Sequence, residues 1–353
     1  MLQSNTFVVA CGALLASVPA AAQDQLAIYG IVDVFVTNVR AEGLAPTTRI
    51  DSNGLLASRI GFRGSEALGG GLRSNFVLEL GFNPSLGGAA DANRLANRQA
   101  WVGLSGSAGE LRLGRQNTPQ FLMNGRYDAF TSATQASGWN NLFGAPPRTD
   151  NAIGLFSPSL GGWKLQALLA RGASGGGTPV SRTAANQNSH WAAEYEGQGR
   201  YFGANYEVVK LEGQSATRRI SLGMSWAAAP AWTLFGAAGS ERRDEHNQDT
   251  RLLSLSLRRT LSGAASLSLG WAGLQDRLSG AGHGNASEIS AMYRYLLSKR
   301  TTIYSAAAHL AQQGLRNSFF LGGSAVVEAG AQIRSPLPGG DINGVELGMV
   351  HSF

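Results

Sequence analysis

The sequence has almost no cysteine: Cys11 is the only one, and it lies within the first 22 residues. Once that segment is removed, disulfides, thiolate catalysis and cysteine-based metal sites are all excluded. A lipoprotein cleavage site at Cys11 is an alternative interpretation, but the apolar run around it continues past it. The five histidines are far apart in the sequence, and we expect neither a metal nor another cofactor.

Lysine is scarce as well, since only Lys164, Lys210 and Lys299 contribute to the 29 basic residues. Arginine therefore supplies nearly all the positive charge of a chain whose formal net charge is +6. Its planar guanidinium group suits contacts with carboxylates and phosphates. Because the basic residues are spread along the whole chain rather than gathered in one patch, no nucleic-acid partner is expected.

Long hydrophobic runs are missing from the chain after residue 22, although 43% of its residues are hydrophobic. A soluble domain of this size would bury a large core and show long apolar helices or buried strands. The longest uncharged stretch, Trp226–Ser240, contains Pro230, which would break a helix but suits a hairpin turn. Glycine is abundant instead, with 47 residues, nearly twice the average usage of about 7%.

Residues 1–22 carry no charge, and their apolar run Phe7–Val18 is followed by small residues ending at Ala22. This pattern predicts a secretory signal peptide cleaved after Ala22, which leaves residues 23–353 as the mature chain. The first six residues lack the usual Lys or Arg, which a mis-assigned start codon would explain. The run is too short for a transmembrane anchor.

Apolar and polar residues alternate along the mature chain, first in Leu26–Asn38 and more sharply in Gly71–Asn83. In the second segment the leucines and phenylalanines share one parity, while Arg73 and Glu79 have the other. A period of two is typical of strands with one apolar face, and a soluble sandwich would show it too. The same alternation recurs near residues 162–171, 188–197, 217–228, 249–260, 263–272 and 286–297.

The connections favour a transmembrane barrel over a sandwich, because every second one is short and turn-like. The short connections are Glu66–Gly71, Gly106–Gly109, Pro158–Gly162, Gly197–Gly199, Ala228–Ala231, Thr260–Gly263 and Ser298–Thr301. The longer, more polar connections are residues 38–54, 83–97, 116–150, 171–188, 209–217, 241–249, 273–285 and 312–341. This predicts an all-β fold, a 16-stranded antiparallel transmembrane β-barrel with short periplasmic turns and long extracellular loops. A barrel of that size leaves an aqueous lumen.

Several short motifs carry a family resemblance through their order and spacing. They are Tyr29–Asp33, Ser58–Glu66, Asn97–Leu104, Leu113–Gln116, Asn151–Pro158, Gly161-Gly162, Ser298–Thr301 and the final His351-Ser352-Phe353. Over nearly the whole mature chain the sequence resembles the Gram-negative trimeric general porins, particularly those of β-proteobacteria. The resemblance implies a homotrimer in the bacterial outer membrane, surrounded by outer-membrane lipid and lipopolysaccharide. In such porins loop 2, here residues 83–97, contacts a neighbouring subunit.

The resemblance also implies a third extracellular loop, here about residues 117–150, that folds into the lumen and narrows it. Arg59 and Arg98 fall on wall positions that carry arginines in the family, and Asp128 falls near its acidic loop position. A third wall arginine is not evident after the loop, where Arg148 is the nearest substitute. We expect Arg59, Arg98, Arg115, Asp128 and Arg148 at the constriction.

Further pore-lining candidates are Arg63, Arg73 and Glu79, with Arg112 as another arginine near them. Arg112 and Arg115 have opposite parity, so both cannot face the lumen. A loop with so few acids opposite several guanidinium groups predicts a positive constriction, which favours anions. The alternative is that these arginines are simply solvated lumen residues.

The last residues, Val345–Phe353, alternate and end in an aromatic residue. We expect this segment to be the strand that closes the barrel by pairing with Leu26–Asn38. In the family, a terminal strand with a final aromatic residue is read by the barrel-assembly machinery, which makes Phe353 the assembly signal.

The predicted function is an outer-membrane porin, a water-filled channel for passive diffusion of small hydrophilic solutes, small anionic solutes above all. A substrate-specific channel for anionic organic solutes or phosphate is the alternative, and an adhesive barrel is a further one. An enzyme is not expected: Gly172–Gly176 matches G-x-S-x-G, but that motif needs a strand before it and a helix after it. Here it lies in a glycine-rich loop.

Overall fold

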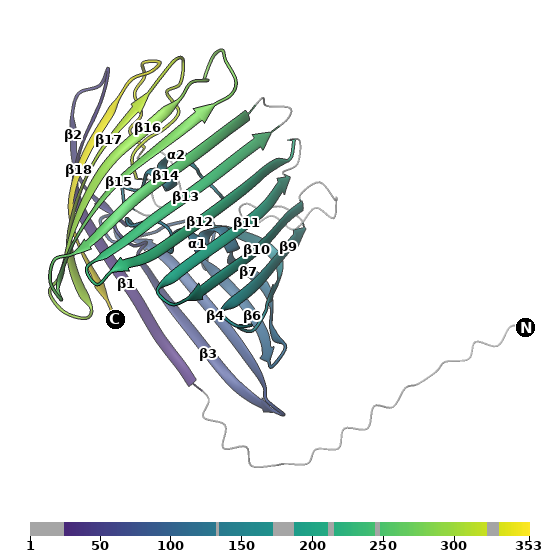
Figure 1. The fold of residues 1–353 in the computed structure, drawn as a ribbon. Helices are drawn as coiled ribbons and strands as arrows, with labels where there is room; N and C mark the ends of the chain where they lie inside the picture. The colour runs from purple at the N-terminus through teal and green to yellow at the C-terminus, as the bar shows by residue number, and fades with distance from the viewer. Residues whose placement is uncertain (1–24, 132–133, 172–186, 211–214, 244–247, 323–331) are drawn as a thin grey trace, which may run out of the picture.

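A computed structural model describes residues 25–131, 134–171, 187–210, 215–243, 248–322 and 332–353. They form an antiparallel sheet that closes on itself, with two short helices inside the barrel (Figure 1). No helix in this part of the chain is long and apolar enough to cross a membrane. The predicted signal peptide and the G-x-S-x-G segment lie outside the described residues.

The strands pair around the barrel wall in the order in which they follow one another in the chain. The strands are β1 Gln25–Ala41, β2 Thr47–Ser52, β3 Arg59–Gly69, β4 Leu72–Asn83, β5 Gly88–Ala89, β6 Gln99–Gly106, β7 Gly109–Asn117, β8 Arg148–Phe156, β9 Trp163–Arg171, β10 Gln187–Gly197, β11 Arg200–Lys210, β12 Thr217–Ala229, β13 Trp232–Arg243, β14 Gln248–Thr260, β15 Ala265–Asp276, β16 Ala286–Leu296, β17 Thr301–Gln312 and β18 Ile342–Ser352. The helices are α1 Pro119–Asn124 and α2 Gly138–Leu142.

The wall itself has 16 strands, as the sequence predicts. Segments β2 and β3 both pair with β1 and act as one strand with a break, and the two-residue β5 lies in loop 2. The barrel closes where β18 pairs with β1, with Val36 opposite Leu347. Figure 1 shows the C-terminus beside β1. The predicted pairing of the final segment with the first strand is therefore confirmed.

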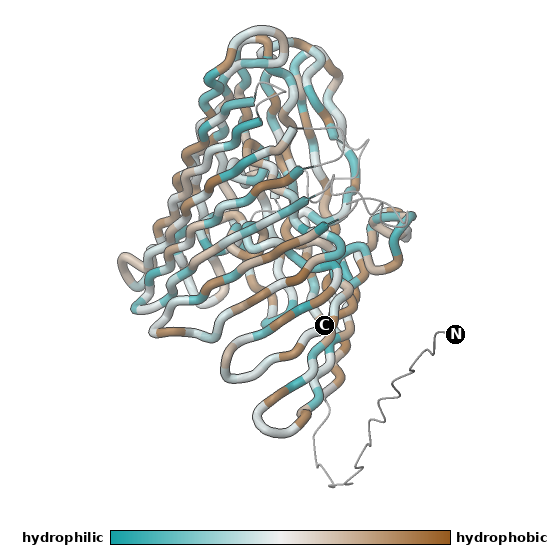
Figure 2. Tube along the Cα trace, turned by 90° about the vertical axis from the view of Figure 1, so that its right-hand side faces the viewer, coloured by the Kyte–Doolittle hydropathy of each residue, from teal (hydrophilic) through white to brown (hydrophobic). Residues whose placement is uncertain are grey.

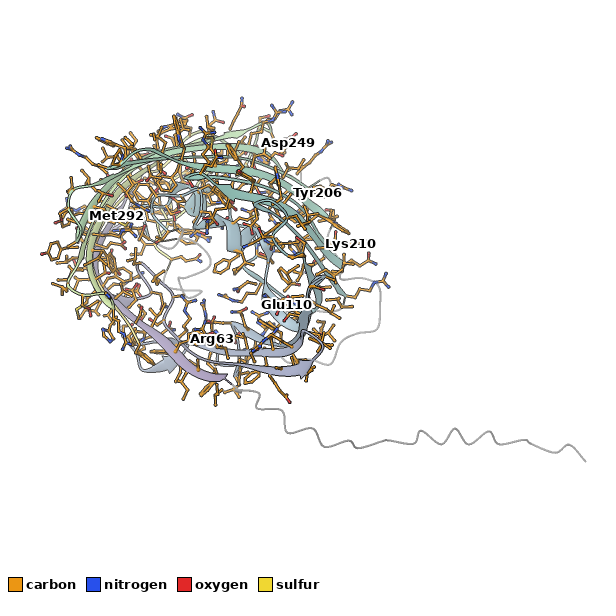
Figure 3. All side chains as sticks on the ribbon, turned by 60° about the horizontal axis from the view of Figure 1, so that its bottom comes forward. Arg63, Glu110, Tyr206, Lys210, Asp249 and Met292 are labelled. Atoms are coloured by element: carbon orange, nitrogen blue, oxygen red, sulfur yellow. The ribbon has the colours of Figure 1, made fainter. Side chains whose placement is uncertain are left out.

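Each strand turns alternate residues toward lipid and toward the lumen. On β14, Leu253 is 44% exposed on the outside while its neighbour Leu252 is only 3% exposed on the inside. Apolar and polar positions alternate along the tube in Figure 2. Viewed along the barrel in Figure 3, Arg63 and Glu110 point into the ring, whereas Tyr206 points away from it. This is the apolar-out pattern that a bilayer requires of a spanning barrel.

The first loop is much shorter than residues 38–54, the range expected from sequence. β1 continues to Ala41 and pairs with β2, so most of that range is a strand hairpin. After the hairpin of β1 and β2, residues 53–58 leave the sheet and turn into the barrel before β3 begins. The Asp33 carboxylate accepts the backbone N–H groups of Leu55 and Leu56 at 2.7 and 2.6 Å and the Tyr304 hydroxyl at 2.6 Å. The bonds to Asp33 satisfy backbone N–H groups of the buried segment that have no partner in the sheet.

Loop 3 connects β7 to β8 and lies inside the barrel, as expected. Each of its helices begins with a side-chain cap, since Thr118 Oγ1 accepts Phe121 N–H and Ser137 Oγ accepts Asn140 N–H. Its helices pack on the inner face of the wall, α1 on β9–β12 and α2 on β14–β16. Three wall glycines allow this contact, because a Cβ there would collide with loop 3 rings; the pairs are Gly223 with Tyr127, Gly270 with Phe130 and Gly239 with Phe143.

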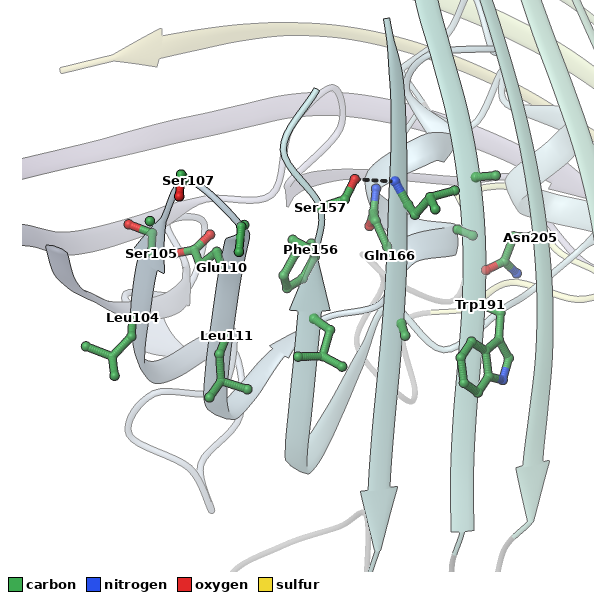
Figure 4. A pocket seen from close by; sticks show the side chains of 18 of the residues that line it. Leu104, Ser105, Ser107, Glu110, Leu111, Phe156, Ser157, Gln166, Trp191 and Asn205 are labelled. Carbon is green, nitrogen blue, oxygen red and sulfur yellow. Dashed lines mark hydrogen bonds between the residues drawn. The ribbon is translucent and has the colours of Figure 1, made fainter. Parts of the chain in front are cut away.

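A hollow of about 1200 Å³ lies outside the lumen. It is lined mainly by outward apolar side chains of β6–β12, among them Leu104, Leu111 and Trp191 (Figure 4). Lipid chains would fill such a surface in a membrane, so the hollow is not part of the permeation path.

Candidate functional site

Three arginines lie on the wall across the lumen from loop 3. Arg59 opens β3, Arg98 stands one residue before β6, and Arg148 opens β8. All three are at the ends of their strands that lead from the long extracellular loops. Because the helices of loop 3 rest on β9–β12 and β14–β16, the loop lies across the lumen from Arg59 of β3 and Arg98 beside β6.

The carboxylate of Glu79 holds two of these arginines together. Its Oε1 lies 2.6 Å from Arg98 Nε and 3.8 Å from Arg59 Nη1, and its Oε2 accepts the Tyr29 hydroxyl at 3.0 Å. Among the described residues, no other carboxylate is within ion-pair distance of Arg59, Arg98 or Arg148. Of the three guanidinium groups, two share the one carboxylate of Glu79, which leaves this part of the lumen positive.

Arg148 connects the arginine wall to loop 3. Its guanidinium carbon lies 5.1 Å from the centre of the Phe121 ring, which belongs to α1. Arg148 Nε and Arg98 Nη2 are both buried and have no hydrogen-bond partner within the described protein. Buried guanidinium N–H groups without protein acceptors are available to water or to an anion.

The carboxylate of Asp128 does not face the arginines, contrary to the sequence-based expectation. Asp128 is 2% exposed and accepts hydrogen bonds from Phe130 N–H at 3.0 Å and from the Ser137 hydroxyl. It therefore organises loop 3 from within. A fully buried wall carboxyl group, Glu288 of β16, accepts the Asn141 side chain at 2.7 Å and anchors α2.

Arg115 also differs from the expectation. It stands opposite Ala100 and shares strand parity with Leu111 and Leu113, which are exposed on the outside. Its side chain pairs with Asp150, as does that of Arg94 in loop 2. Sequence parity showed that Arg112 and Arg115 cannot both face the lumen, but not which of them does.

The remaining candidates line the lumen below the constriction. Arg112 is stacked between the rings of Trp101 and Phe156, with centroid distances of 4.4 and 4.2 Å, and is paired with Glu110 at 2.6 Å. Arg63 lies 5.4 Å from the centre of the Tyr29 ring. In the same region, Arg73 Nε donates to Ser65 Oγ at 3.0 Å.

A buried charge network behind α1 was missed from sequence. Arg219 of β12 stands directly opposite Glu207 on one neighbouring strand and Glu241 on the other, and it pairs with both. His190 Nδ1 lies 3.1 Å from Glu207. In the sequence, Glu207, Arg219 and Glu241 each have the parity of the inward residues of their strands. Only the strand register shows that the three side chains meet.

Burial affects one titratable group of loop 3. Tyr127 is 1% exposed, and this burial raises the pKa of its hydroxyl well above the ordinary value. The hydroxyl therefore stays protonated, and it donates to Asn124 Oδ1 at 2.8 Å. The bond joins the end of α1 to the segment that follows it.

Comparison with known proteins agrees with this architecture. The model of the Gram-negative porin family matches residues 7–315. Outer membrane porin protein 32 of Delftia acidovorans is 35% identical over 165 residues, which cover 44% of this chain and 46% of the relative. The alignment thus spans about half the length of that relative.

Solved structures match over almost the whole chain. The anion-selective porin from Comamonas acidovorans has a TM-score of 0.74 at 25% identity, covering 94% of this chain and 100% of that one. The trimer form of OmpT from Vibrio cholerae has a TM-score of 0.68 at 11% identity, covering 94% and 99%, and shares the fold. The family match extends over most of the barrel that surrounds the arginine wall and loop 3, and the chain belongs to the Gram-negative porin family.

Proposed function

We propose that the protein is a water-filled channel through the outer membrane that passes small hydrophilic solutes and favours anions. The observation that carries the proposal is the arginine wall of Arg59, Arg98 and Arg148, in which the single carboxylate of Glu79 pairs with Arg59 and Arg98 only. With Asp128 turned into loop 3, little negative charge opposes that cluster. A ring of fixed positive charge lowers the barrier for anions and raises it for cations.

The narrowness of the passage strengthens this effect. Loop 3 fills one side of the lumen, so an ion near the arginines is surrounded by less water than in bulk. Electrostatic interactions grow as the surrounding dielectric falls. The similar porin from Comamonas acidovorans is described as anion-selective, which supports the same preference here.

The remaining parts of the proposal concern assembly. A homotrimer is supported by the trimer form of the similarly folded OmpT. Outer-membrane lipid, lipopolysaccharide and the barrel-assembly machinery are the other proposed partners, and the proposed route of export is a signal peptide, residues 1–22. The proposed role is transport without chemistry on the solute.

Reversal potential in a planar bilayer, measured with a KCl gradient, tests the selectivity. We expect the sign of an anion-selective channel. Replacing Arg59 and Arg98 with Gln should move the potential toward zero, because two of the three guanidinium groups are lost. Arg200→Gln is the matched control, since Arg200 lies on the outer face near a short turn. A cation-selective sign for the unmodified protein would overturn the proposal.

A solute-specific channel is the second candidate. Below the constriction, Arg63, Arg73 and Arg112 continue the series of arginines along the same wall, and only Arg112 among them pairs with a carboxylate of the described residues. Such a series could bind an anionic organic solute or phosphate at successive positions. Saturable block of the chloride current by phosphate would favour this candidate, whereas a current that ignores phosphate supports the general pore.

A further inference from the structure

A second pair of arginines lies on the side of the lumen that carries loop 3. Arg258 of β14 and Arg294 of β16 each stand two residues before the periplasmic end of their strand. They have the parity of the inward, buried residues Ser256 and Met292. In Figure 3, Met292 and Glu110 of β7 lie on opposite sides of the ring. The pair therefore faces the arginines of β3, β4 and β7 across the lumen.

Arg258 is fixed directly beneath loop 3. Its Nη2 donates to the backbone carbonyl of Ala129, and its guanidinium carbon lies 5.0 Å from the centre of the Phe235 ring. The N–H group of Ala129 donates to Ser256 Oγ at 3.2 Å, so this part of the loop is bound to β14 at two points. Arg258 Nε is buried and has no hydrogen-bond partner in the described protein. A buried donor of this kind is stabilised when water or an anion reaches it.

Arg294 has no partner of its own. Its side chain is partly buried, and it makes no hydrogen bond or ion pair with any residue that the structure describes. The strand between the two arginines, β15, places Ser268 opposite Arg258 and Ser266 opposite Arg294. Ser266 has inward parity, and its hydroxyl likewise has no partner among the described residues. Two guanidinium groups and one hydroxyl group thus face the same part of the lumen.

The charge of this pair is not neutralised by the protein around it. In the described part of the chain, no carboxylate lies within ion-pair distance of Arg258 or Arg294. At Arg258, the repulsion from Arg294 is stronger than the attraction from Asp128, whose carboxylate is bound inside loop 3. The two arginines are two strand spacings apart, about 10 Å, so their long side chains can close around one small anion. Such an anion would offset the repulsion between them.

We propose that Arg258 and Arg294, together with the Ser266 hydroxyl, form a binding site for a small oxyanion of the phosphate type below loop 3. Guanidinium groups bind phosphate oxygens through paired, charge-assisted hydrogen bonds. The inference rests on the proposed channel function and extends it, since an anion that has passed the arginine wall meets a second positive position on the opposite side. Conduction requires sites that bind an ion and also release it.

Protection of arginines from phenylglyoxal tests the site directly on the purified full-length protein, with the modified residues mapped by mass spectrometry. The reagent reacts with guanidinium groups, and inorganic phosphate is the probe. Chloride at the same ionic strength gives the reference rate. Arg259 is the internal control, because it follows Arg258 in the sequence but lies on the outer face, stacked on Trp232.

We expect phosphate to slow the reaction at Arg294 about threefold or more, because a guanidinium group that holds an anion is shielded from the reagent. The rate at Arg259 should stay the same. Equal rates at Arg294 in phosphate and in chloride would overturn the proposal. An equal slowing at Arg259 would also overturn it, because it would show a general effect of phosphate on the reagent.

Arg294→Gln removes one half of the site without touching loop 3, since Arg258 alone of the pair binds the loop. In a planar bilayer with a KCl gradient, the chloride-over-potassium permeability ratio should fall about twofold, as expected for a unit charge several ångströms from the ion path. The matched control is Arg259→Gln, which removes the same charge at a similar depth on the outer face. Equal ratios in the two variants would place Arg294 outside the ion path and contradict the site.

The two experiments separate this inference from the proposed function. A cation-selective sign for the unmodified protein, with Arg294 protected by phosphate, would contradict the function and retain the site. An anion-selective sign with Arg294 unprotected would retain the function and contradict the site. Should Arg294→Gln fail to form a barrel, protection measured on the unmodified protein decides.

Discussion

Two carboxylates that look similar in sequence have different places in the pore. Glu79 extends from β4 into the lumen, where it lies between Arg59 and Arg98 and accepts the Tyr29 hydroxyl. Asp128 is buried in loop 3 and binds its own segment. The charge that a passing ion meets is therefore set by Glu79 and the arginines, with Asp128 acting through the shape of the loop.

Replacing Glu79 with Gln should strengthen the preference for anions. The amide oxygen can still accept from Arg98 Nε, and the amide NH2 group can donate to the Tyr29 hydroxyl oxygen, but the negative charge beside the guanidinium groups is gone. A unit charge about 4 Å away is worth about 1 kcal/mol in water, which corresponds to roughly a fivefold change in the permeability ratio. Reversal potentials measure that ratio.

A control for this substitution is Glu196→Gln, because the Glu196 side chain is 63% exposed at the end of β10 and pairs with Arg126 away from the arginine wall. Its effect on the reversal potential should be small. An unchanged ratio in the Glu79 variant would contradict the assignment of Glu79 to the ion path.

At the scale of elements, the position of loop 3 depends on close packing against the wall. Aromatic rings of the loop lie directly on wall glycines, where no side chain separates ring from strand. Trp139 packs between Tyr127 and Phe143, with ring centroids 5.2 and 4.8 Å away. This cluster belongs to the larger of two apolar cores that loop 3 shares with the inner wall, and Phe130 belongs to the second.

Gly223→Ala should displace loop 3 from β12, because the added methyl group would occupy the place of the Tyr127 ring. We expect a barrel that assembles but shows altered conductance and noisier current, measured by single-channel recording. Gly236→Ala on the outer face is the control, since its methyl group would have no neighbour closer than 3.5 Å. Identical recordings for both variants would show that loop 3 does not depend on this contact.

The sequence predicts the wall of the barrel better than its contents. Period-two alternation and turns rich in glycine and proline place the strands, because each signal is local. The polar residues of the range 38–54 indicate a loop, although Ile50 stands between Arg49 and Asp51 with the alternation of a strand. The orientation of Asp128 was not predictable, since a loop without a period does not reveal which way its side chains face.

At the scale of the molecule, the first and last strands of the barrel form one joint. β1 pairs with β3 on one side and with β18 on the other. Phe353 adds to the joint, since its ring covers Gly30 and its backbone exchanges two hydrogen bonds of 3.0 Å with that residue. Backbone groups at an open sheet edge would have no hydrogen-bond partner in lipid, so this joint is required for insertion.

Replacing Phe353 with Ala should reduce the amount of assembled barrel in the outer membrane several-fold, because both the ring on Gly30 and the proposed assembly signal are lost. Heat-modifiable mobility on gels measures the assembled fraction. Protein refolded in detergent should keep its reversal potential, since Phe353 is exposed on the outer face of the barrel and does not line the lumen. Normal assembly of the variant in cells would contradict the role of Phe353.

The pairing of β1 with β18 also has a consequence for synthesis. The partner of β1 is β18, which is synthesised more than 300 residues later, so the barrel cannot close while translation continues. A chain that stops before β18 exposes two unpaired edges, which invite pairing with other chains. Only a chain that has been translated to its final strand can close the barrel. Closure therefore separates full-length chains from truncated ones, which stay prone to aggregation.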